Sequence, residues 1–286
     1  MATKQTYPAP KAFKGAKVHV WAFDSMLEAA DKSQSDARWH KSHGSDSWAG
    51  QSYEQAWRYA REGDLSAVAA SDALLDKMEA YGLATVKAQW VDDVAGATPN
   101  VQAYVAGVPL TMRRRTKAAS NAAPLAIIVD LATSAFINVE QARKRGVAIL
   151  ALVRALSQRR PVELWACSGL DADGCKNACF LTVRIDTAPL DLARAAYCLT
   201  NVGFPRRILY GLASGEFGFN GHWPFGRGRL SRSEMEACLA PAFQHVTQTL
   251  CIPGAHMSDE ALDNPEAWLA KEIAEHDPIA LREAAE

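Results

Sequence analysis

Two apolar runs separated by a helix-length segment constrain this 286-residue sequence more than any other feature. Residues 125–131 read LAIIVDL and residues 162–166 read VELWA, and residues 139–158 between them have the pattern of a helix. Continuous apolar strands that flank a helix are typical of parallel strands buried on both faces. The sequence therefore predicts an α/β fold with a partly parallel sheet covered by helices.

The rest of the chain supplies further elements for the same fold. Ser52 is a predicted N-cap for a helix that runs to about Arg61, with Gln55 as its capping-box partner and Gly63 as its stop. Further strands are expected at residues 15–23 and 178–186, and further helices at 24–31, 66–81, 190–200, 204–214 and 231–248. We expect a three-layer core, von Willebrand A-like or Rossmann-like, with irregular insertions. One elaborated domain at 1–257 is followed by an acidic helical segment at 258–286.

The start of the chain does not have the pattern of an export signal. Its first twenty residues contain four lysines and two prolines without an apolar run, and no later segment has the length of a membrane span. The six cysteines lie in apolar surroundings rather than at disulfide-scaffold spacings. We therefore expect an intracellular protein with reduced thiols and no membrane partner.

Charge is divided unevenly along the chain. Residues 105–232 carry 18 Lys and Arg against 8 Asp and Glu, whereas residues 233–286 carry 2 against 11. Fifteen of the basic residues in the middle block are arginines, whose planar guanidinium suits phosphates and stacks on bases. This separation of charge predicts a polyanionic partner.

Basic residues gather in two parts of the middle block, and the second part also contains aromatic residues. One part is the run RRRTK at residues 113–117, and the other is FGFNGHWPFGRGRLSR at 217–232. Aromatic rings can stack on unpaired bases while arginines contact the backbone, although such rings also pack beneath their own loops. The predicted DNA-binding residues are Arg113, Arg114, Arg115, Lys117, Arg206, Arg207, Trp223, Phe225, Arg227, Arg229 and Arg232.

The first apolar run ends in a polar turn, Asp130-Leu131-Ala132-Thr133-Ser134. Ligands often bind at the carboxyl ends of parallel strands, and this turn resembles an incomplete Asp-x-Ser-x-Ser metal site of von Willebrand A domains. Ala132 stands where the first hydroxyl would be, and no complementary ligands are evident. We expect no metal, no cofactor and no catalytic residue, and we read the turn as a cap of the following helix.

The acidic end has a short apolar stripe. Trp268, Leu269 and Ile273 would share one face of a helix. This pattern predicts either a docking site for a protein partner or a terminal helix exposed to solvent. The sequence leaves the choice open.

Three segments also carry a resemblance. They are WAGQSYEQAWRYAREGD at 48–64, VDDVAGATPNVQAYVAGVP at 91–109, and the LAIIVDL and VELWA runs. Together they resemble the Drc-like proteins, single-stranded-DNA-binding RNA polymerase cofactors of lytic podophages that package their own polymerase. The resemblance implies a non-enzymatic transcription cofactor in the host bacterial cytoplasm, with single-stranded DNA and a phage-encoded RNA polymerase as partners. The alternative is a von Willebrand A-like metal or protein-interaction module that partners an ATPase. The oligomeric state stays open.

Overall fold

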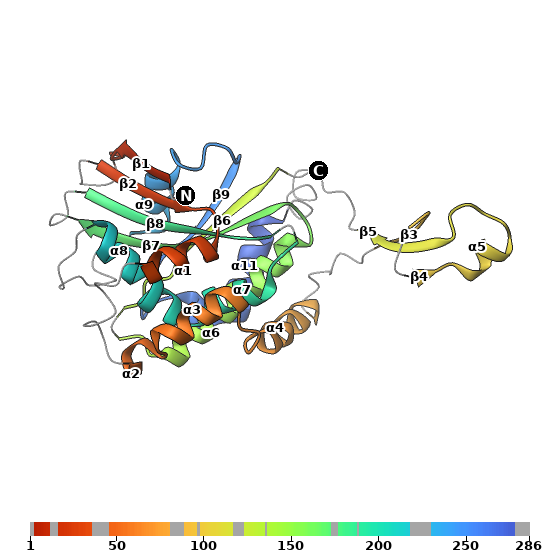
Figure 1. Cartoon of the computed structure of the whole chain (residues 1–286), viewed down its shortest axis with the longest axis horizontal. Helices are drawn as coiled ribbons and strands as arrows, with labels where there is room; N and C mark the ends of the chain where they lie inside the picture. Colours follow the sequence, from red (N-terminus) through yellow and green to blue (C-terminus); the bar gives the residue numbers. More distant parts are fainter. Residues whose placement is uncertain are drawn as a thin grey trace.

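A computed structural model describes residues 3–11, 17–35, 46–80, 89–95, 98–116, 123–134, 136–172, 177–187, 189–217 and 230–277. These residues form a mixed α/β body around a six-stranded sheet, together with a small three-stranded sheet that extends from it (Figure 1). Among the described residues, no helix is long and apolar enough to cross a membrane.

The central sheet confirms the expected partly parallel arrangement. β6 is parallel to β7 on one side and to β9 on the other, and β2 is parallel to β8. β7 and β8 are antiparallel because only residues 173–176 separate them, and β1 is antiparallel to β2. In order across the sheet, the strands are β1 (Thr3–Pro8), β2 (Lys17–Phe23), β8 (Asn177–Ile185), β7 (Val162–Ala172), β6 (Leu125–Asp130) and β9 (Gln248–Ile252).

Alternate residues of β6 enter two different parts of the core. Leu125, Ile127 and Val129 belong to the larger cluster, which most of the helices complete. Ala126 and Ile128 belong to a smaller cluster on the opposite face, covered by the helix α9 (Arg232–Leu239). Burial on both faces explains why the apolar run is continuous. The helices of the larger cluster are α1 (Met26–Ser35), α3 (Tyr53–Glu62), α4 (Val68–Ala80), α6 (Val139–Ser157), α7 (Leu192–Thr200), the π-helix η2 (Phe204–Leu209), α8 (Tyr210–Phe217), α10 (Glu260–Asp263) and α11 (Pro265–His276).

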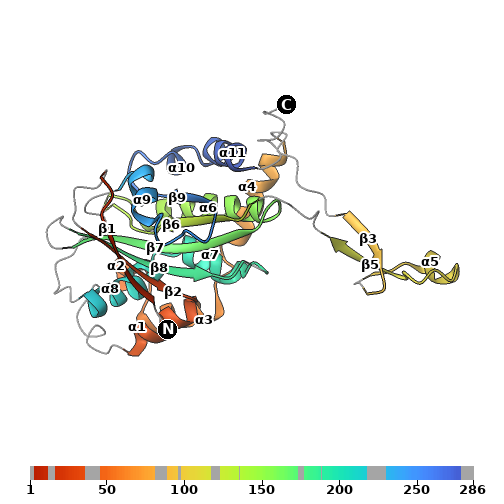
Figure 2. The ribbon, with the colours of Figure 1, turned by 90° about the horizontal axis from the view of Figure 1, so that it is seen from above.

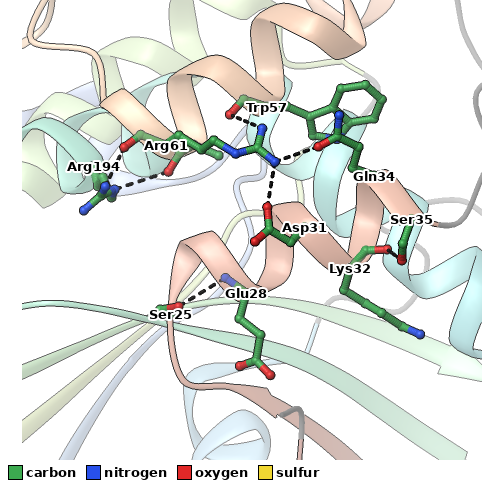
Figure 3. Close-up of polar contacts among 10 residues, drawn as sticks. Ser25, Glu28, Asp31, Lys32, Gln34, Ser35, Trp57, Arg61 and Arg194 are labelled. Carbon is green, nitrogen blue, oxygen red and sulfur yellow. Dashed lines mark hydrogen bonds and ion pairs between the residues drawn. The ribbon is translucent and has the colours of Figure 1, made fainter.

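Two arginines hold neighbouring helices together on this face (Figure 3). Arg61 of α3 donates to Asp31 Oδ1 and Gln34 Oε1 of α1, each at 2.6 Å. Arg194 of α7 donates to the backbone carbonyls of Ala60 and Arg61 at the end of α3. These carbonyls have no partner within the helix, so arginine donors satisfy them and fix α7 against α3.

The helix starts follow the expected local chemistry. Ser52 caps α3 through a capping box with Gln55, and Gly63 ends the helix with φ of 81°. Asn138 and Gln141 form the same device at the start of α6. The cap of α6 is therefore Asn138, and the polar turn at residues 130–134 does not cap it. The reciprocal bonds satisfy amide groups that would otherwise lack partners.

Residues 89–95 and 98–116 form an arm that extends away from the body in both views (Figures 1 and 2). β5 (Met112–Thr116) lies in the middle of the small sheet and is antiparallel to β3 (Gln89–Asp93) and β4 (Thr98–Pro99). The short helix α5 (Val101–Val105) lies at the far end of the arm. The sequence did not predict this second sheet.

The C-terminal part of the body differs from the expectation in two ways. The helix expected at 231–248 ends at Leu239, and residues 248–252 form the edge strand β9. Ala240 still has helical backbone angles, but Pro241 after it has no amide hydrogen and cannot donate the next helical hydrogen bond. Beyond residue 258, α11 packs on α6, and its buried residues belong to the larger core cluster.

Candidate nucleic-acid interface

The carboxyl edge of β6 lies at the point where the chain changes direction across the sheet. β7 follows β6 on one side through α6, and β9 arrives much later on the other side. Thr133 forms a parallel bridge with Ala255, and Ser134 N donates to Ala255 O at 3.0 Å. Ligands of open α/β sheets bind outside the strand ends at such a switch point. This edge is therefore the expected position of a ligand site in the sheet.

Asp130 is enclosed by backbone at this edge. Its Oδ1 accepts from Ala132 N at 2.9 Å and from Gly169 N at 3.5 Å. A Cβ built on Gly254 would lie 3.2 Å from Asp130 Oδ2, so a glycine lets the chain pass close to the carboxylate. Burial raises the pKa of Asp130 to about 6, although the two amides act in the opposite direction.

The turn fits a cation poorly. Ala132 supplies a methyl group where an oxygen ligand would be needed, and the Arg206 guanidinium lies 3.5 Å from Thr133 Oγ1. A positive group at a prospective hydroxyl ligand repels a second cation, and Mg²⁺ requires a nearly complete set of oxygen ligands. The described residues of this turn therefore do not form a complete cation site, and Arg206 supplies a positive charge beside it.

Replacing Asp130 with asparagine is expected to change how stability depends on pH. Because the pKa of Asp130 is raised in the folded state, its contribution to stability is full below about pH 4 and is lost as the pH rises through about 6. An asparagine keeps an oxygen acceptor for the amides of Ala132 and Gly169 and carries no charge, although its amide nitrogen cannot accept from Gly254 N. The melting temperature of the Asp130→Asn protein should exceed that of the wild type by more at pH 7 than at pH 4. An equal difference at both pH values would contradict the raised pKa.

Arg206 and Trp48 form a pair at the same edge. Trp48 lies in the short helix α2 (Asp46–Ala49), and 42% of its surface is exposed. The Arg206 guanidinium lies 5.1 Å from the centre of the indole ring and donates to the Trp48 carbonyl. An indole with a cation on its face, next to open solvent, can stack on a base while the guanidinium contacts a phosphate.

Arg207 does not lie on this surface. It is 2% exposed, it donates to Gln51 O at 3.0 Å and it pairs with Asp46 Oδ1 at 2.6 Å. Its guanidinium also stacks 4.5 Å from the ring of Tyr53. The prediction that Arg207 contacts DNA is wrong, because the side chain is used to hold α2, and with it Trp48, against η2.

Arg232 is also engaged within the protein. It pairs with Glu272 Oε1 of α11 at 2.5 Å, and the Glu272 side chain is almost fully buried. A buried carboxylate needs its cation, so releasing Arg232 to a phosphate would leave Glu272 uncompensated. Arg232 therefore holds α9 against α11, and because about a third of its side chain is exposed, its contact with DNA stays a prediction.

The other predicted DNA-binding residues fall into two groups. Arg113 is half exposed on the arm and pairs with Asp92 at 3.1 Å. Arg114 and Arg115 follow it on β5, but their side chains lie outside the described residues. So do the whole residues Lys117, Trp223, Phe225, Arg227 and Arg229.

The predicted partner-binding stripe lies inside the protein. Trp268, Leu269 and Ile273 are 6%, 0% and 2% exposed and belong to the larger core cluster. The prediction of an exposed docking face on α11 is wrong, because these side chains are covered by the body of the same chain. The stripe forms a structural contact.

Sequence reasoning did not single out Trp48 as a site residue. Its direct neighbours are Ser47 and Ala49, within a segment that is rich in serine, histidine, aspartate and glycine. The available signal was a tryptophan in a mainly polar segment, because a large ring with few apolar residues around it in the sequence either packs against distant residues or takes part in binding. Its pairing with Arg206 joins residues too far apart in sequence for any local pattern to show.

Comparison with known proteins gives one match. The model of a protein family described as a domain of unknown function (DUF7192) matches residues 3–264. No curated protein and no solved structure matches the chain. The matched region includes both the central sheet and the arm.

Proposed function

The chain belongs to the DUF7192 family, and we propose that it is a single-stranded DNA-binding transcription cofactor rather than an enzyme. The observation that carries this proposal is the Trp48–Arg206 pair at the switch-point edge of the sheet. Its geometry suits an unpaired base, because a ring exposed beside a guanidinium can be reached by a base that is not already stacked in a duplex.

Electrostatics support the same proposal. The chain is close to neutral overall, yet residues 105–232 concentrate its arginines. Arg113 is half exposed on the arm, and Arg206 lies on the body. Basic groups on both parts could contact the phosphates of one extended strand, and such contacts provide affinity without sequence preference.

The biological setting rests on the resemblance to Drc-like phage cofactors. In that setting the protein acts in the host bacterial cytoplasm, where it binds locally unwound promoter DNA and recruits a phage-encoded RNA polymerase. The buried α11 stripe cannot supply the polymerase contact. That contact would have to come from another surface.

A second candidate is the von Willebrand A-like interaction module that partners an ATPase. It is favoured by Asp130 and Thr133 at the carboxyl edge of β6. It is weakened by Ala132 and by the guanidinium near Thr133. Binding of an ATPase partner that requires magnesium and Asp130 would favour this candidate, whereas DNA binding that is unchanged by magnesium and by Asp130→Ala would favour the first.

Replacing Trp48 with alanine is expected to weaken binding of single-stranded DNA. One stacked base contributes about 1–3 kcal/mol, which corresponds to about 5-fold to 150-fold in Kd. Fluorescence anisotropy with a labelled oligonucleotide at fixed salt would measure the loss. Trp48→Phe should keep part of the affinity, because a smaller ring still stacks.

Leu65→Ala provides a matched control, since Leu65 is an exposed apolar residue on the body that our site does not include. It should bind DNA like the wild type. Melting temperatures of all three variants would show whether any loss comes from unfolding. Unchanged affinity of a folded Trp48→Ala protein would rule out Trp48 as the stacking residue.

A further inference from the structure

The far end of the arm presents apolar side chains that the body of the chain does not cover. Val101, Tyr104 and Val105 of α5 are 66%, 73% and 79% exposed. They stand at positions i, i+3 and i+4, so they lie on one face of the helix. This spacing is typical of a helix that lays its apolar side chains into a groove of a partner.

The body carries a groove of the complementary kind. It has a volume of about 620 Å³ and lies between α4, α6 and the start of α11. Ala70 and Ala73 of α4 and Val147 of α6 are among its apolar lining residues. The two alanines are small and exposed, so they leave room for larger side chains from outside.

The charges of the two surfaces are compatible. α5 has the sequence VQAYV and carries no charge. At the groove, Lys77 and Glu266 pair with each other at 2.6 Å. Glu140, Arg143 and Lys144 also line the groove, and Arg143 donates to Ser66 O at 3.2 Å. An uncharged helix brings no like charge to these groups, and the Tyr104 hydroxyl can bond with the polar rim.

We propose that α5 of one copy docks into the α4–α6 groove of a second copy. The arm extends away from its own body in Figures 1 and 2, and the exposed fractions of its three apolar residues show that its own groove does not hold them. Reciprocal docking closes a dimer, and one-way docking extends a chain of copies. The contact places neighbouring copies side by side independently of DNA.

Sedimentation velocity of the full-length protein without DNA tests this contact. The wild type should associate increasingly as its concentration rises. Tyr104→Asp places a charge on the docking face and Ala73→Arg fills the groove, so each variant should remain monomeric. The controls are Val94→Asp, exposed on the arm but outside α5, and Ala69→Arg, exposed on α4 but outside the groove lining. Both controls should associate like the wild type.

Mixing the two defective variants provides the sharper result. Tyr104→Asp keeps an intact groove and Ala73→Arg keeps an intact arm, so the mixture should regain association that neither variant shows alone. Melting temperatures would confirm that both variants fold. A wild type that stays monomeric at every concentration would overturn the proposal, because the arm then docks on its own body or on nothing. Association that persists in both variants, or a mixture that regains none, would overturn it as well. Since DNA is absent throughout, none of these outcomes bears on the proposed DNA binding.

Discussion

Replacing Trp268 with alanine is expected to lower the free energy of unfolding by about 3–5 kcal/mol. The side chain is 6% exposed and belongs to the larger core cluster, where α11 packs on α6. Truncating a buried tryptophan removes its apolar contacts and leaves a cavity that the surroundings fill only in part. Urea denaturation followed by circular dichroism would measure the loss as a lower midpoint.

Lys271→Ala is the matched control on the same helix. Lys271 is about half exposed and pairs with Glu260 at 3.4 Å on the surface. A substitution of this kind usually changes stability by less than about 0.5 kcal/mol. If Trp268→Ala kept the stability of the wild type and lost only the capture of a polymerase, Trp268 would be a docking residue and the packing described here would be wrong.

Because α11 packs into the core, a C-terminal truncation cannot separate an effect on DNA binding from an effect on folding. A chain cut after Ser258 loses both α10 and α11, and with them Leu269 and Ile273 of the core. We expect such a chain to be unstable, so a loss of DNA binding would follow from unfolding. Point substitutions of exposed acidic residues are therefore the better way to test whether the acidic segment at 258–286 affects DNA binding.

Much of the fold could be predicted because local chemistry and burial act together. The continuous apolar run of β6 implied burial on both faces, and the structure shows both faces covered. The capping box of Ser52 and Gln55 could be read from four residues of sequence. In each case the pattern that forms the element is contained within the element itself.

The predictions that failed concern where a side chain points after the chain has folded. Arg206 and Arg207 are neighbours with the same charge, yet successive residues of a helix point in different directions. Arg206 reaches the indole of Trp48, and Arg207 enters the core. For α11, the apolar stripe was correctly identified. The stripe alone does not tell whether the helix packs on the core of the same chain or on a partner.

The arm was missed for a related reason. Its strands are short, and the β4 strand has only two residues, Thr98–Pro99. Strands of this length have too few residues to show a period of two. The exposed side chains of α5 have spacings that also fit a helix packed in a core, so only the structure shows that they are uncovered.

The central claim is that the protein binds unpaired bases, and a comparison of single-stranded with duplex DNA tests it most directly. Stacking at Trp48 requires a base outside a duplex, whereas phosphate contacts from Arg113 and Arg206 are available to both forms. The full-length protein should be titrated against a labelled oligonucleotide and against the same oligonucleotide annealed to its complement, at two salt concentrations.

We expect single-stranded DNA to bind at least about 5-fold more tightly, since even one stacked base contributes about 1–3 kcal/mol. Both affinities should fall as salt rises, because both include phosphate contacts. The preference should shrink in the Trp48→Ala protein, which loses the stacking surface. Equal affinities for the two forms at matched salt, in a folded wild-type protein, would contradict the account.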